Sequence, residues 1–143
     1  MKAPRPCRAV PLLAACCVAG ACGSGPNVAQ GFSDVPLLTL LSASGTLRLE
    51  VFSDPQPPVR GNVAVRYRIS DLSSQPVNGL TLRVVPWMPA MGHGTSVVPS
   101  VSATGAGLYD LSNVYLFMPG DWQLRTAISG AATDSATPEL MVQ

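Results

Sequence analysis

NVAVRYRIS, at residues 62–70, carries the clearest structural signal in this chain. Every second residue from Val63 to Ile69 is apolar, and the residues between them include Arg66 and Arg68. An alternation with a period of two puts successive side chains on opposite faces of a strand, whereas a helix needs a period of 3.6. The stretch therefore predicts a β-strand with one face in a core and the other in water.

The same kind of pattern recurs along the chain, between turns rich in Gly, Pro, Asn and Asp. Regular alternation also occurs at residues 46–51, 80–84 and 122–128, and less regular strands are expected at 97–103, 109–118 and 139–142. Residues 35–43 are apolar and allow either a first strand or a short helix. About seven short strands without an amphipathic helix predict an all-β fold, namely an immunoglobulin-like antiparallel β-sandwich.

The N-terminus has the pattern of an export signal. Lys2, Arg5 and Arg8 precede the apolar run AVPLLAACCVAGA at residues 9–21. A basic start, a short apolar core and small residues at the end are typical of a secretory signal peptide. The run is shorter than the roughly 20 residues that a membrane-spanning helix needs. Residues 1–21 are therefore predicted to be a signal peptide of the lipoprotein type.

The end of this signal resembles the lipobox of bacterial lipoproteins, in which a cysteine is acylated and becomes the first mature residue. AGAC, at residues 19–22, places small residues before Cys22, and a Gly/Ser-rich stretch follows. LAAC, at residues 13–16, is a rival lipobox, but Cys16 would leave only seven apolar residues after the basic start. Ordinary cleavage is a third reading, because residues 19–21 also satisfy the A-x-A rule. We predict lipidation at Cys22.

Lipidation at Cys22 would divide the mature chain into a tether, residues 22–42, and a β-sandwich domain, residues 43–143. The expected location is the periplasmic side of the cell envelope, with the lipid in a membrane. Gly23 stands where some lipoproteins carry the Asp that retains them in the inner membrane. By this resemblance the outer membrane is favoured over the inner one.

The composition of the domain excludes several kinds of functional site. All four cysteines lie at or before Cys22, so the domain has no disulfide, no thiolate metal site and no cysteine nucleophile. Of the nine basic residues, three precede Cys22, which leaves six arginines against eight carboxylates. No basic cluster is present, and nucleic-acid binding is disfavoured because it requires clustered Lys or Arg against phosphates.

One segment, PWMPAMGHGT at residues 86–95, gathers two methionines around the only histidine of the chain. The thioethers of Met88 and Met91 and the imidazole of His93 are neutral ligands. Thioethers prefer Cu(I) to hard cations, whereas zinc prefers thiolate, imidazole and carboxylate. Met118, on a second proline–glycine corner, is a candidate fourth ligand. These residue types predict a site for Cu(I) rather than for zinc.

A packing interpretation of the same residues stays open. Methionines fill irregular gaps in cores, so Trp87 and Trp122 could pack against methionine sulfur. His93 could hydrogen-bond a backbone carbonyl and lock the loop. A mixed arrangement, with Met91 and His93 exposed and Met88 buried, is also consistent with the sequence.

The order of the motifs resembles the YtkA-like family, which overlaps with the FixH-like proteins. MPAMGHG at residues 88–94 is followed by GLY at 107–109, FMPG at 117–120 and WQL at 122–124. The resemblance extends over roughly residues 45–129. It implies a small exported or membrane-tethered β-sandwich domain, and some relatives are associated with copper handling or with the assembly of copper-containing oxidases.

The motif chemistry and the resemblance together predict a lipid-anchored domain that binds Cu(I) through Met88, Met91, His93 and Met118. Such a domain would buffer or deliver copper without catalytic turnover, so we do not expect an enzyme. The alternative is a metal-free module that contacts another protein of the cell envelope. The contact surface of such a module would be its loop end or exposed strand edges.

The lipidation site can be tested by metabolic labelling with a palmitate analogue. We expect the wild-type protein to be labelled and a Cys22→Ser variant to lose the label, because its acylation site is gone. A Cys16→Ser variant serves as the matched control and should keep the label. A Cys22→Ser protein that still labels would assign the lipid to Cys16.

Overall fold

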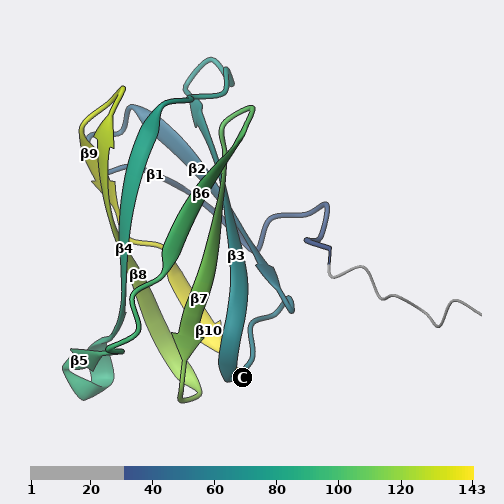
Figure 1. Cartoon of the computed structure of the whole chain (residues 1–143), viewed down its shortest axis with the longest axis vertical. Helices are drawn as coiled ribbons and strands as arrows, with labels where there is room; N and C mark the ends of the chain where they lie inside the picture. Colours follow the sequence, from purple (N-terminus) through teal and green to yellow (C-terminus); the bar gives the residue numbers. More distant parts are fainter. Residues whose placement is uncertain (1–30) are drawn as a thin grey trace, which may run out of the picture.

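The structure of this chain is a computed structural model that describes residues 31–143. Lys2, Cys16 and Cys22, together with the predicted signal peptide, lie outside the described residues. The described part consists of two antiparallel sheets that face each other, as Figure 1 shows. The strands are β1 (Leu38–Leu41), β2 (Leu47–Asp54), β3 (Gly61–Asp71), β4 (Leu80–Met88), β5 (His93–Gly94), β6 (Ser100–Gly105), β7 (Leu108–Leu116), β8 (Gly120–Gly130), β9 (Asp134–Ala136) and β10 (Glu139–Val142). The predicted all-β sandwich is confirmed.

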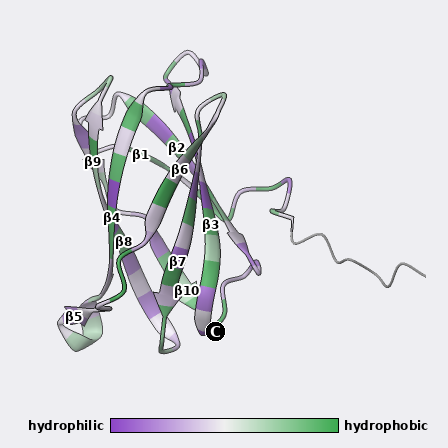
Figure 2. Ribbon diagram, viewed as in Figure 1, coloured by the Kyte–Doolittle hydropathy of each residue, from purple (hydrophilic) through white to green (hydrophobic). Residues whose placement is uncertain are grey.

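The two sheets have five strands each. Sheet A has the order β1-β2-β3-β7-β6, and sheet B has the order β10-β8-β4-β5, with β9 also paired to β8. The alternation seen in the sequence is reproduced along β3, where Val63, Val65, Tyr67 and Ile69 are all buried. Figure 2 shows the resulting change of hydropathy from residue to residue along the strands. The apolar faces of the two sheets form the core between them.

The structure has ten strands rather than about seven, and the additional ones are short. β1 resolves the ambiguity at residues 35–43 in favour of a strand, because Leu38–Leu41 pair with β2 and contribute Leu38 and Leu40 to the core. The folded part therefore begins before residue 43, within the segment expected to be tether. β5 and β9 were not predicted, because two and three residues are too few to show a period.

Two tyrosines join elements across the core. The Tyr67 hydroxyl of sheet A lies 3.2 Å from Thr126 Oγ1 of sheet B, and burial raises the pKa of Tyr67 well above its usual range. The Tyr109 hydroxyl donates to the Val77 carbonyl at 2.8 Å. The ten strands named above and the core between them are built from residues 31–143, so this segment has the core of a folding unit.

The segment before β1, residues 32–37, crosses the outer face of sheet A, and we call it the N-terminal strap. The Phe32 ring lies 4.4 Å from the guanidinium carbon of Arg66. Gln56 Nε2 donates to the Val35 carbonyl at 2.9 Å, and the Leu37 N–H donates to the Val51 carbonyl of β2 at 2.7 Å. The path of the chain into the sandwich is therefore fixed by specific contacts from Phe32 onward.

A carboxylate on β9 fastens the turn between β1 and β2 to sheet B. Asp134 accepts hydrogen bonds from the backbone N–H and the hydroxyl of Ser44. The Ala43 N–H also donates to the Ser135 carbonyl at 2.7 Å. Hydrogen bonds from Ser42 and Ser44 stabilise the charged form and hold the pKa of Asp134 well below its usual range.

This depressed pKa predicts a pH-dependent contribution to stability. A lowered folded-state pKa stabilises the fold above the unfolded-state value of about 3.9, and the contribution is lost as the pH falls toward the folded-state value. We expect Asp134→Asn to lower the melting temperature at neutral pH. The difference from wild type should shrink below about pH 4, as measured by thermal denaturation.

Asp121→Asn is the matched control, because Asp121 is exposed and its carboxylate has no hydrogen bond within residues 31–143. Its melting temperature should follow that of the wild type at all pH values. A difference between Asp134→Asn and wild type that persists unchanged at low pH would contradict the assigned role of the Asp134 carboxylate.

Candidate functional site

The MPAMGHG segment forms a tight tip at the end of sheet B, seen at the lower left of Figure 1 beside the label β5. β4 ends at Met88, and a 3-10 turn, Pro89–Met91, reverses the chain. Gly92 has a φ of 66°, in the left-handed region that glycine adopts without steric cost, and its N–H donates to the Pro89 carbonyl at 3.1 Å. The segment that looked like a loop is therefore a turn flanked by two paired strands.

β5 returns along β4 in an antiparallel pair. His93 lies opposite Met88, and Gly94 lies opposite Trp87. A Cβ at residue 94 would stand 2.2 Å from the Pro86 carbonyl oxygen, so only glycine permits this approach. The two glycines around His93 thus have separate tasks, since Gly92 turns the chain and Gly94 brings it close to β4.

His93 is held against an aromatic pair that leads into the core. Its ring stacks on Phe117, with 5.9 Å between centroids and 2° between ring planes. Phe117 meets Trp122 edge to face at 5.1 Å and 86°. Trp122 is fully buried and donates its Nε1–H to the Met118 carbonyl at 2.9 Å. The imidazole therefore lies at the surface but has a rigid support behind it.

The contact between His93 and Gly94 indicates which ring nitrogen of His93 carries the proton. Nδ1 lies 3.2 Å from the Gly94 carbonyl oxygen. A carbonyl oxygen only accepts, so this contact is a hydrogen bond when Nδ1 carries the proton. In the neutral ring Nε2 is then the nitrogen with the lone pair, and it is the one that a metal would bind. The sequence-based suggestion that His93 bonds a backbone carbonyl agrees with this contact.

The three methionines lie in different environments. Met91, on the 3-10 turn, is 50% exposed, whereas Met88 is 5% exposed and belongs to the core. Met118 is half-buried and packs against the core. The structure therefore has the mixed arrangement, with Met91 and His93 exposed and Met88 buried.

The structure brings these candidates to one end of the sandwich. Met88 and His93 face each other across β4 and β5, and opposite residues of an antiparallel pair lie on the same face. Met118 follows Phe117, on which His93 stacks. The methyl carbon of Met88 would lie 3.0 Å from a Cβ at Gly120, which places the two proline–glycine corners side by side.

The two tryptophans near the candidate ligands make different contacts. Trp122 donates a hydrogen bond to the Met118 backbone carbonyl, whereas the ring of Trp87 lies under the guanidinium of Arg125, at 4.4 Å. Within residues 31–143, no three His, Cys, Asp or Glu side chains are grouped to hold a metal. A metal at the tip would need thioether ligands.

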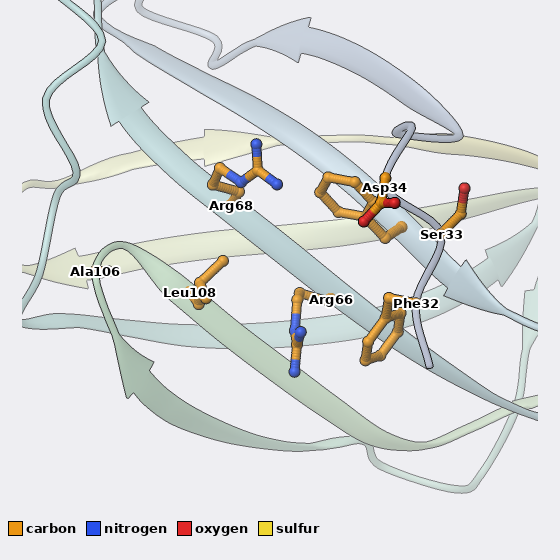
Figure 3. A pocket seen from close by; sticks show the side chains of 8 residues that line it. Phe32, Ser33, Asp34, Arg66, Arg68, Ala106 and Leu108 are labelled. Carbon is orange, nitrogen blue, oxygen red and sulfur yellow. The ribbon is translucent and has the colours of Figure 1, made fainter. Parts of the chain in front are cut away.

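A separate hollow of about 330 Å³ lies on the outer face of sheet A, under the N-terminal strap. Figure 3 shows Phe32 and Arg66 side by side, with Asp34 above Phe32 and Arg68 farther away. Both arginines are bonded to carboxylates, Arg66 to Asp110 and Arg68 to Glu50. The cationic groups around this hollow are therefore already neutralised.

The fold and the tip define an antiparallel β-sandwich with a Met/His turn at one end. The chain belongs to the YtkA-like family, which it matches over residues 42–127, more than half of its 143 residues. The resemblance noted from the motifs is confirmed. No curated protein and no solved structure matches the chain significantly. No helix in the described part of the chain is long and apolar enough to span a membrane.

The two glycines of the tip give a paired prediction. Gly94→Ala should destabilise the fold by about 2–3 kcal/mol, because β5 must move away from the Pro86 carbonyl. Gly92→Ala has open space for its Cβ but keeps a positive φ, so it should cost about 1 kcal/mol. Urea denaturation measures both values. Equal effects of the two variants would contradict the close approach at Gly94.

Proposed function

We propose that this protein is a lipid-anchored domain of the cell envelope that binds Cu(I) at its tip and buffers or delivers the ion. The exposed pair of Met91 and His93 carries this proposal, because both side chains reach solvent from one short turn that is fixed to the core. Met88, opposite His93 on β4, and Met118, next to Phe117, would be additional sulfur donors. The lipid on Cys22 would keep the domain at the membrane surface.

The chemistry of the donors favours a soft monovalent ion. A site made of thioethers and one neutral imidazole brings no negative charge, which suits Cu(I) better than a divalent cation. The stack on Phe117 restricts the imidazole in advance, so less conformational entropy is lost when an ion binds. Transfer to a partner requires an accessible ion, and the half-exposed Met91 provides that access. No step of this function requires turnover.

The proposal can be tested by titrating Cu(I) into untagged residues 31–143 in the presence of a competing chelator. This segment contains no cysteine, so thiolates cannot contribute to the signal. We expect one ion per chain. His93→Ala and Met91→Leu should each abolish this binding, or weaken it at least tenfold, about 1.4 kcal/mol, while the fold is retained.

Met141→Leu is the matched control, because Met141 is a similarly exposed methionine on β10 and is not part of the tip. It should bind like the wild type. Wild-type affinity no better than micromolar would refute the copper site. Unfolding of His93→Ala would assign His93 a structural role instead.

A metal-free interaction module is the second candidate, and a group of exposed apolar side chains favours it. Met91, Val98 and Tyr115 are 50%, 71% and 38% exposed. Tyr115 lies 6.4 Å from Phe117, between ring centroids, and Phe117 in turn supports His93. Exposed apolar side chains of this kind suit contact with another envelope protein. A failed copper titration would leave this function as the better supported one.

A further inference from the structure

Two arginines on the outer face of sheet B differ from those of sheet A. Arg83 on β4 and Arg125 on β8 have no carboxylate oxygen within 4.0 Å among residues 31–143, whereas Arg66 and Arg68 are both paired. Arg83 lies opposite Ala127, and Arg125 is two residues from Ala127 along β8. The two cations are therefore diagonal neighbours on one face, close enough for a single anion to contact both.

A hollow lies between these two side chains. It has a volume of about 270 Å³ and is lined by both arginines together with Ala127, Ser135 and Thr137. Ala127 is exposed and lies between Arg83 on one neighbouring strand and Ser135 on the other. Its small side chain leaves room at the centre, and the residues around it include two arginines, two hydroxyl side chains and the apolar Val85.

The nearest carboxylates are occupied elsewhere. Asp134 lies on the opposite face of β9 from Ser135 and is bonded to Ser44. Glu139 accepts a hydrogen bond from Gln123 Nε2 at 3.0 Å, and Arg125 donates to the carbonyl oxygen of the same Gln123. Arg125 uses its Nε–H and one Nη in the bond to Gln123, so the donors left at the hollow are the Arg83 guanidinium, the remaining N–H groups of Arg125 and the hydroxyls of Ser135 and Thr137.

We propose that this hollow is a binding site for a phosphate group. Guanidinium groups match the geometry of phosphate oxygens, and hydroxyl donors complete such a site. Trp87 holds the Arg125 guanidinium from below at 4.4 Å. The phosphate belongs either to an inorganic ion or to the headgroup of an anionic lipid. The site lies on a different surface from the tip, so it does not depend on copper binding.

Two arms of one experiment distinguish these sources, both with residues 31–143. In the first, inorganic phosphate is titrated while amide and arginine Nε–H resonances are followed by NMR. In the second, the protein is sedimented with vesicles of phosphatidylglycerol and phosphatidylcholine at low ionic strength. We expect saturable binding in at least one arm, and its affinity should fall about fivefold in Arg83→Gln and again in Arg125→Gln.

Two further variants decide whether the hollow itself is responsible. Ala127→Leu fills the centre without changing charge and should also abolish binding, with unchanged amide dispersion elsewhere. Arg60→Gln removes one charge from an exposed residue outside the hollow and should leave binding intact. Binding to phosphate alone assigns the site to the ion, and binding to vesicles assigns it to the headgroup. Absence of binding in both arms, or equal losses in Arg60→Gln and Arg83→Gln, would overturn the site.

Discussion

The edge-to-face contact between Phe117 and Trp122 is the interaction on which the geometry of the tip depends. Trp122 is fully buried and bonded to the chain at Met118, so its position is set by the core. Phe117 rests on it, and His93 rests on Phe117. The exposed imidazole is therefore held against the core through the rings of Phe117 and Trp122. A short turn at the end of a sheet is mobile in most proteins, but here its one titratable ring is fixed from behind.

Most of the fold could be predicted from the sequence, because strand alternation is a local property. β3 and β8 showed it clearly, and both run the length of their sheets. Three strands were not predicted as strands, and each has a physical reason. β5 and β9 exist only because a neighbouring strand offers hydrogen-bond partners, and so few residues carry no period of their own. β1 is apolar at nearly every position, which a strand and a helix share.

The candidate residues Met88, Met91 and His93 came from the motif, and the structure places all three at the same end of sheet B. Their binding of copper stays a prediction. The supporting role of Phe117 was missed, since the stack joins β5 to the corner between β7 and β8, and the sequence does not show that these two segments meet. The need for glycine at residue 94 could not be predicted either, because a Cβ there clashes with the Pro86 carbonyl only when β5 is paired with β4.

The N-terminal strap has a consequence for how the domain responds to force. A pull on the chain from its N-terminal side reaches Phe32 first, where the ring lies against Arg66, and then the hydrogen bond from Gln56 to the Val35 carbonyl. Both contacts can yield before any load reaches the ladder between β1 and β2. The strap would therefore detach first under load, while the two sheets stay intact.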